Sequence, residues 1–422
     1  MNWLGWALAI FMLIGAADRI FGGKLGLGKE LENGIMLLGV MMMSMVGMIV
    51  MSPVIAWLLD PIFSKMDGVI DPSIIPALLF ANDMGGAPLA IEVANDSLLG
   101  KFNGLVVAAM MGATISFTVP FSLGIVKKDR QKELLVGLLC GVVTIPVGCF
   151  CGGLVAGVKL GALFFDLLPL IVMAAVIAFG LLKFPNASVK IFSWLGVGMT
   201  ALITVGLAVG IFEALTGVKL IPHTAPISDG MDVIANAAYA LAGSFPLIAI
   251  VSRLLKKPMV KLGVKIGMNE HSMLGLVATL ATSTPVFSLM EKMDRRGMVL
   301  NSAFATSAAW VVGGHLAFTM AMDASFVPAM AVAKIVGGIT AVALAALLYK
   351  RIFKDSAAEL TPLGGAELVA DAELSGCAAV VCGGEVAAAD GDNAAVEGEN
   401  SAADGLEMKK MQEKVEPNEE IL

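Results

Sequence analysis

Charged residues are scarce in this chain of 422 residues. Asp, Glu, Lys and Arg make up 15% of it, hydrophobic residues make up 58%, and the mean hydropathy is +0.86. Soluble domains are about half apolar and carry about 25% charged residues. The composition therefore excludes an ordinary water-soluble globular protein and predicts a protein that is solvated mainly by lipid.

Cysteine and histidine are also few, and their spacing does not form a metal-binding pattern. Cys140, Cys149 and Cys151 lie in one apolar run, whereas Cys377 and Cys382 lie near the C-terminus without histidines. Structural zinc sites need Cys and His pairs at short spacing. The chain also lacks a phosphate-binding Gly-rich loop with lysine, a His-Glu-x-x-His motif and a nucleophile elbow. We therefore expect no enzyme, no cofactor, no metal site and no self-contained ATP-driven pump.

Long apolar runs dominate the first 350 positions. A helix needs about 20 apolar residues to cross the roughly 30 Å hydrocarbon core of a bilayer. The first run follows no basic segment and precedes no small-residue cleavage site, which favours a retained span over a signal peptide. We expect nine full spans, near residues 3–20, 35–58, 104–126, 133–157, 162–182, 191–212, 231–252, 297–321 and 327–349.

Two further apolar segments, 72–93 and 272–290, are interrupted by turn-forming residues and are expected to enter and leave the bilayer on the same side. Lys and Arg concentrate in cytoplasmic loops. With two re-entrant hairpins, every basic cluster falls in the cytoplasm, the N-terminus lies outside and the C-terminal tail lies inside. The clusters are Lys24 with Lys29, Lys127 to Lys132, Lys183 with Lys190, Arg253 to Lys265, and Lys350 to Lys354.

The order of spans and hairpins is the same in the two halves of the chain, but the second half begins on the opposite side of the membrane. We expect an all-α polytopic membrane protein of nine transmembrane helices plus two re-entrant hairpins in two inverted repeats. Repeat one covers about 3–157, a bridging span 162–182, and repeat two about 191–349, within a transporter domain of residues 1–355. Inverted repeats with broken helices at the membrane midplane are typical of secondary transporters.

Residues 356–422 differ in composition from the rest of the chain. They contain 15 acidic residues against 3 lysines, so the tail has a charge of −12 and the body of +5, which sum to the net charge of −7. Few large apolar residues are present to offset the entropy cost of ordering. We expect a disordered cytoplasmic tail, and a partner that binds it stays an open alternative.

The first hairpin contains Asn82, Asp83, Gly85 and Gly86 at its interruption. A carboxylate at the centre of a membrane helix costs about 2.5–3.5 kcal/mol on insertion scales, so it usually has a partner and a role. Asp83 is predicted to be the counter-ion of a cationic substrate, and the alternative is an anchor within the protein. The two glycines allow the backbone to approach a ligand closely.

The second hairpin supplies the hydroxyls of Thr282, Ser283 and Thr284 before a proline. They are predicted to bind a substrate hydroxyl, although Ser and Thr also join membrane helices. Asn301 and His315 are polar positions within the apolar run that follows. His315 can titrate near neutral pH, but a buried histidine is also a common packing group.

Four motifs taken together resemble the ethanolamine-utilisation permease family, the EutH type, over roughly residues 1–354. They are Asn82-Asp83-Met84-Gly85-Gly86, Met111-Gly112-Ala113-Thr114-Ile115-Ser116-Phe117, Val143-Thr144-Ile145-Pro146-Val147-Gly148-Cys149 and Met293-Asp294-Arg295-Arg296-Gly297. The chain departs from the expected pattern in having Thr282-Ser283-Thr284 where an Asn pair is expected, and Gly314 where an acidic residue is expected.

The resemblance implies a carrier in the bacterial cytoplasmic membrane that imports ethanolamine for its catabolism. Ethanolamine is a small ammonium cation with one hydroxyl, which agrees with Asp83 and Thr282 to Thr284 as ligands. Expected partners are ethanolamine and the lipid bilayer, without nucleic acid, and a homo-oligomer stays open. The alternatives are a carrier of another small amine, an amino acid or a nucleoside, or a membrane scaffold or sensor.

Overall fold

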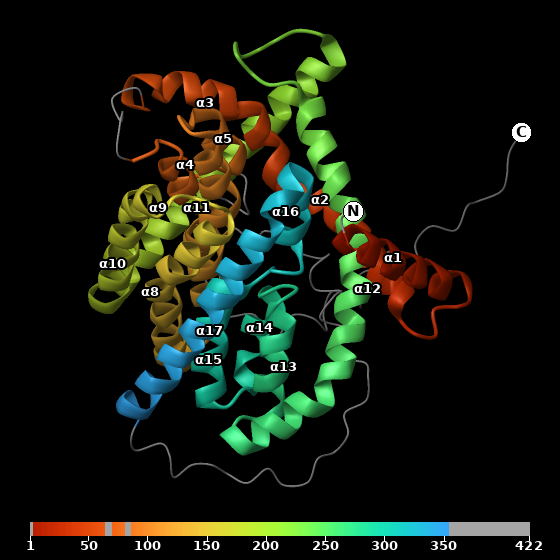
Figure 1. Cartoon of the computed structure of the whole chain (residues 1–422), viewed down its shortest axis with the longest axis vertical. Coiled ribbons are helices and arrows are strands. Elements are labelled where there is room, and N and C mark those ends of the chain that lie inside the picture. The colour runs from red at the N-terminus through yellow and green to blue at the C-terminus, as the bar shows by residue number, and fades with distance from the viewer. Residues whose placement is uncertain (1–2, 64–69, 81–85, 354–422) are drawn as a thin grey trace, which may run out of the picture. The chain divides into compact units, whose positions relative to one another are not determined.

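The computed structural model describes residues 3–63, 70–80 and 86–353, and every regular element in these ranges is helical (Figure 1). The described residues all belong to one compact unit, Met1–Cys382. The long helices are α1 (Trp3–Ile20), α2 (Leu27–Met41), α3 (Gly47–Phe63), α8 (Gln131–Val155), α10 (Leu168–Lys183), α11 (Pro185–Thr216), α12 (Ile227–Ile266) and α17 (Val327–Ile352). The predicted tail 356–422 lies outside the described residues.

Seven helical stretches among the described residues are long and apolar enough to cross a membrane. They are Trp3–Ile20, Leu27–Pro61, Lys128–Val155, Leu160–Lys183, Pro185–Thr216, Ile227–Pro258 and Gly314–Ile352. Each overlaps a predicted span, because runs of about 20 apolar residues are the strongest signal that a membrane sequence carries. The predictions of nine spans and of two inverted repeats are not settled by these seven helices.

The surfaces of α10 and α11 carry many large apolar side chains that are left exposed by the described part of the chain. Val172, Phe179, Leu182, Trp194 and Leu215 are all at least 59% exposed. Such an apolar surface is costly in water and is expected where helices face lipid tails. The basic segment Arg253 to Lys265, predicted as a loop, instead continues α12 as a helix to Ile266.

The predicted span 104–126 is helical, but much of it is wound as π-helix. The π segments η2 (Asn103–Gly112) and η3 (Thr114–Thr118) lie between α6 (Ser97–Phe102) and α7 (Val119–Ile125). π-helical turns are rare and often occur at functional sites. Another π segment, η1 (Met42–Val46), joins α2 to α3.

The predicted span 297–321 is not one continuous helix. It consists of α15 (Arg295–Ala308) and α16 (Gly314–Asp323), separated by residues 309–313. After α16 the chain continues through the 3-10 turn η6 (Ala324–Phe326) into α17. Both segments that follow a predicted hairpin are therefore irregular at mid-length.

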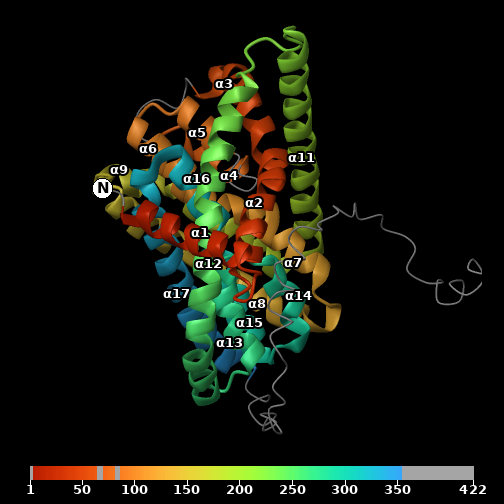
Figure 2. The same ribbon diagram turned by 90° about the vertical axis from the view of Figure 1, so that its right-hand side faces the viewer.

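Each predicted hairpin contains a pair of short helices that pack against each other. The first pair is α4 (Ile74–Leu79) and α5 (Gly86–Val93), and the second is α13 (Glu270–Thr279) and α14 (Thr284–Ser288), which leads into the 3-10 turn η5 (Leu289–Lys292). At 1.5 Å per residue, none of these helices can cross the membrane alone. The two pairs lie toward opposite ends of the unit in both views (Figure 1, Figure 2).

The start of the first short helix in each pair, α4 or α13, is held by an asparagine, a serine and an aspartate, although the atoms that bond differ between the two pairs. Asn103 Nδ2 donates a hydrogen bond to Ser73 Oγ at 2.9 Å, and Asn301 Nδ2 donates one to the Ser272 carbonyl at 2.8 Å. The hydroxyl of each serine donates to an aspartate, Ser73 to Asp71 at 2.5 Å and Ser272 to Asp294 at 2.6 Å. The start of each helix pair, which we call its base, is thus tied to the irregular segment that follows the pair in the chain.

An aspartate also caps the helix that follows each pair. Asp96 accepts hydrogen bonds from the amides of Leu98 and Leu99 at the start of α6. Asp294 accepts one from the amide of Gly297 at the start of α15. A capping side chain satisfies amides that the first helical turn leaves without partners, typically stabilising the helix by about 1 kcal/mol.

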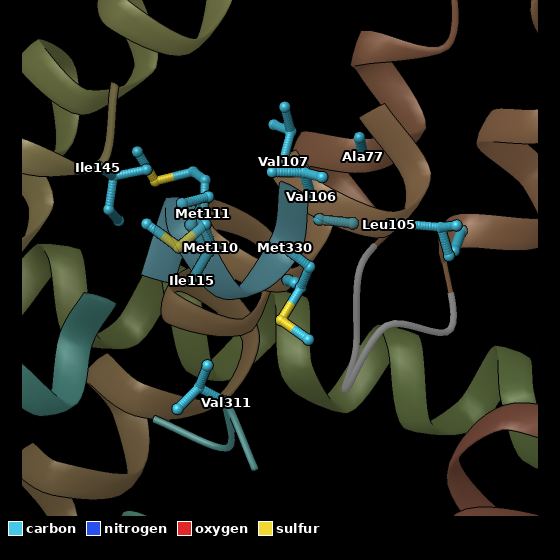
Figure 3. Close-up of a cluster of buried hydrophobic side chains, with 14 of the residues drawn as sticks. Ala77, Leu105, Val106, Val107, Met110, Met111, Ile115, Ile145, Val311 and Met330 are labelled. Atoms are coloured by element: carbon cyan, nitrogen blue, oxygen red, sulfur yellow. The ribbon is translucent and has the colours of Figure 1, made fainter. Parts of the chain in front are cut away.

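Small residues allow α8, α15 and α17 to pack closely. A Cβ atom at Gly141 would collide with Thr306 of α15, and one at Gly148 would collide with the Ala333 carbonyl of α17. Small residues at helix contacts are characteristic of membrane proteins, where close packing replaces the hydrophobic effect. The fully buried η2 segment lies in the adjoining apolar core, with Met110, Met111 and Met330 (Figure 3).

Candidate functional site

The two irregular segments meet at mid-length. Thr114 Oγ1 lies 2.7 Å from the Met110 carbonyl oxygen of its own helix and 3.1 Å from the Thr306 carbonyl oxygen of α15. Val311, in the break between α15 and α16, is buried close to the same core (Figure 3). The hydroxyl of Thr114 therefore joins the π-helical segment to the broken one.

A buried lysine joins the same two segments. Lys334 of α17 is 2% exposed, and its Nζ donates hydrogen bonds to the carbonyls of Ala109 at 2.8 Å and Ala309 at 2.9 Å. Ala109 lies in η2, and Ala309 is the first residue of the break after α15. An ammonium group therefore lies at the point where the two segments cross.

The break between α15 and α16 is held against the second pair of short helices by backbone contacts. The amides of Trp310 and Val312 donate to the carbonyls of Thr279 at 3.2 Å and Leu280 at 2.9 Å. Trp310 has a φ of 60°, a left-handed conformation that a residue with a bulky side chain rarely adopts. A Cβ atom at Gly313 would collide with the carbonyl oxygen of Ala281. The turn at residues 280–283 and the break 309–313 therefore form one unit.

Aromatic rings gather beside this unit. Phe117 of η3 is 4.7 Å from Phe121 and 5.3 Å from Trp310 between ring centroids, and Phe121 is 6.2 Å from Phe287 of α14. Trp310 in turn lies 5.1 Å from the ring of His315. Aromatic faces attract ammonium groups within about 6 Å, and most strongly where water is excluded. This aromatic group, Phe117, Phe121, Phe287 and Trp310, can therefore help to bind a small organic cation.

The predicted ligands of the first hairpin are only partly within the described residues. Asn82, Asp83 and Gly85 lie outside them, so their roles stay predictions. Gly86 is buried and begins α5.

The predicted hydroxyl ligands of the second hairpin lie at the turn between α13 and α14. Thr282 is partly buried in the turn, Ser283 is fully buried, and Thr284 begins α14. The Ser283 hydroxyl has no hydrogen-bond partner within the described part of the chain. A buried hydroxyl without a partner is costly, so it is a good candidate to bind a ligand.

Asn301 and His315 are both fully buried but lie at different places. The Asn301 amide group donates to the carbonyls of Ser272 and Gly297, at the base of the second helix pair. This asparagine is therefore engaged in holding α13 to α15. His315 lies in the first turn of α16, directly after the break and beside Trp310. Of the two, His315 is the one that the structure places at the turn-and-break unit.

Sequence reasoning missed Lys334 and the aromatic group. Lys334 lies within an apolar run, and an intramembrane charge is by itself a functional signal. It could have been found by this rule. The aromatic group could not, because Phe117, Phe287 and Trp310 are far apart in the sequence.

A cavity of about 680 Å³ lies elsewhere in the molecule, between α3, the region of α5 and the loop that follows α11. Trp57 and His223 stack on its wall at 5.3 Å, and Asp60 and Glu92 also line it. None of the described ligand candidates lines this cavity. No group of three His, Cys, Asp or Glu side chains that could hold a metal ion occurs among residues 3–63, 70–80 and 86–353.

Seven apolar helices of membrane-spanning length among the described residues, with two irregular segments that meet at a buried polar contact, define the class as a multi-pass membrane protein. The chain belongs to the family described as "Ethanolamine utilisation protein, EutH", whose model matches residues 4–348. The family resemblance noted from the four motifs is thereby confirmed.

Similar proteins extend over most of the chain. It is 43% identical over 354 residues to "Probable ethanolamine permease EutH" of Listeria monocytogenes serotype 1/2a (strain 10403S), covering 83% of this chain and 95% of that protein. It is 36% identical over 394 residues to the protein of the same name from Salmonella typhimurium, covering 84% and 96%. No solved structure matches the chain.

Proposed function

We propose that this protein is an ethanolamine permease that moves ethanolamine inward across the bacterial cytoplasmic membrane to supply its catabolism. The observation that carries the proposal is the unit formed by the turn 280–283 and the break 309–313, with an aromatic group beside it and a buried Ser283 hydroxyl that no group among the described residues bonds. The names of the relatives from Listeria and Salmonella support the choice of substrate.

The chemistry of the site suits a small ammonium alcohol. The aromatic group offers ring faces to the ammonium end, and Ser283 offers a hydrogen-bonding group to the hydroxyl end. Asp83 is proposed as the counter-ion, because an intramembrane carboxylate is most useful opposite a cation. His315 lies beside Trp310 and is proposed to line the path.

We further propose that transport proceeds by alternating access between two inverted repeats, with nine spans and two re-entrant hairpins. The Asn and Ser residues that hold the start of each helix pair support this plan. Ser73 and Ser272 are separated by 272 − 73 = 199 positions, and Asn103 and Asn301 by 301 − 103 = 198. Equivalent residues at nearly the same spacing are expected if the two halves share one structural plan. The N-terminus is proposed to lie outside and the tail inside.

Binding can be tested separately from transport. Purified protein in detergent is heated with ethanolamine, with other small amines, with amino acids or with nucleosides, and the unfolding midpoint is recorded. A ligand that binds only the folded state raises the midpoint. Ethanolamine is expected to do so, and Ser283→Ala is expected to reduce the rise.

Ser288→Ala is the matched control for Ser283→Ala. Ser288 is the last residue of the short helix α14, which begins directly after Ser283, but it is exposed and its hydroxyl bonds to the Thr284 carbonyl of its own helix. It should leave the ethanolamine response unchanged. A rise with a nucleoside or an amino acid but none with ethanolamine would replace the proposed substrate, and no rise with any solute would favour the scaffold or sensor alternative.

A further inference from the structure

Lys334 is placed unlike an ordinary lysine at a membrane helix end. It lies within α17, is 2% exposed, and directs its Nζ at two backbone carbonyls from different segments. A lysine near a helix end can extend to the membrane surface, but this one ends in the protein interior. Its ammonium group has a specific position, at the crossing of the two irregular segments.

The two carbonyls belong to segments where regular α-helical hydrogen bonding is lost. Ala309 directly follows the last residue of α15, and the final carbonyls of a helix lack intrahelical partners. Ala109 lies in the π-helical η2. Both oxygens carry partial negative charge that a cation can stabilise.

Secondary transporters built from broken helices commonly bind a coupling cation in such a place. Carbonyls of unwound backbone and the C-terminal ends of half-helices coordinate Na⁺ or H⁺ near the midplane. Carbonyl oxygens can replace the hydration shell of a small cation. In this chain the group that faces the two carbonyls is the Lys334 amine, which is covalently attached to α17 and is not a bound ion.

We propose that Lys334 is a built-in cation that takes the place of a coupling sodium ion, so that this protein operates without Na⁺. The ammonium fixes the crossing of η2 with the break after α15, and a dissociable ion is not required there. Lys334 is thus a positioning residue that acts through the two segments. The transport part of this inference rests on the proposed function, whereas the binding part concerns the lysine alone.

The test compares wild type with Lys334→Ala in media where Na⁺, Li⁺ or K⁺ is the only alkali cation. Unfolding midpoints in detergent and uptake of labelled ethanolamine into proteoliposomes are both recorded. Wild type should give the same midpoint and the same uptake in all three salts. In K⁺, the uptake by Lys334→Ala should fall about tenfold or more. Without the lysine, η2 and the break after α15 shift relative to each other, and a small displacement at a functional site can slow the process greatly.

The vacated position is then expected to accept a small cation. Na⁺ or Li⁺ should raise the midpoint of Lys334→Ala by about 2 °C or more and restore part of its uptake. Thr340→Ala is the control, since Thr340 is on the same helix and its hydroxyl bonds to two carbonyls of that helix. It should show no dependence on the salt.

Two results would overturn the inference: a wild type whose uptake requires Na⁺, or a Lys334→Ala variant whose midpoint and uptake are the same in every salt. A wild type that transports no ethanolamine, with the midpoint of Lys334→Ala still raised by Na⁺, would refute the proposed function and leave the built-in cation supported. The two failures are therefore distinguishable.

Discussion

Replacing Gly313 by alanine tests whether the turn 280–283 and the break 309–313 work as one unit. The added Cβ atom would collide with the Ala281 carbonyl oxygen, which is backbone and cannot rotate away. Carbon and carbonyl oxygen approach no closer than about 3.3 Å even in favourable contacts. The turn and the break must therefore separate by roughly 1 Å, and overpacking of this kind costs about 1–3 kcal/mol.

The displacement should affect transport more than folding. A misplacement of about 1 Å at a functional site can lower a rate by about 100-fold. We expect Gly313→Ala to fold but to lose at least about tenfold of ethanolamine uptake in proteoliposomes. The hydrogen bonds from the Trp310 and Val312 amides to the carbonyls at the end of α13 explain why the strain reaches the site.

Gly314→Ala provides a control one residue away. A Cβ atom at Gly314 would have no heavy atom of the described residues within 4 Å. The residue begins α16, where alanine favours the helix more than glycine by up to about 1 kcal/mol. This variant should transport like wild type. Equal uptake by Gly313→Ala and Gly314→Ala would refute the reasoning.

Four further outcomes are expected. Asn301→Ala removes two buried hydrogen bonds to Ser272 and Gly297 and should destabilise the protein by about 1–3 kcal/mol, seen as a lower unfolding midpoint; an unchanged midpoint would contradict this. Gly148→Leu should separate α8 from α17 and abolish expression of folded protein, as judged by size-exclusion chromatography. Deletion of 356–422 should leave uptake intact, whereas a scaffold would lose its function. At low substrate, cells without the protein should grow worse on ethanolamine at acidic than at alkaline pH, because the neutral amine that leaks through lipid becomes rare as pH falls; equal growth would count against a carrier.

Hydropathy predicted the helices well where each lies within one long apolar run. All seven helices of membrane-spanning length overlap predicted spans. It did not predict the break in 297–321, because the residues 309–313 are as apolar as a continuous helix would require. What ends α15 there is tertiary contact, through the Thr279 and Leu280 carbonyls, which a local reading of the sequence does not contain.

The candidate site was predictable in part. Ser283 was identified from its place before Pro285, and the structure leaves its hydroxyl without a partner among the described residues. Asn301 was identified as a polar residue in an apolar run, yet its amide group donates to the Ser272 carbonyl of α13 and to the Gly297 carbonyl of its own helix. Polarity at membrane depth shows that a residue has a partner, but not whether that partner is substrate or protein.

The most direct measurement is uptake of labelled ethanolamine into proteoliposomes that contain the purified protein, with Asp83→Asn in parallel. The account predicts uptake by wild type that excess unlabelled ethanolamine suppresses, and a strong loss in Asp83→Asn. Normal uptake by the variant would remove only the counter-ion role. The absence of uptake by folded wild type would contradict the central claim.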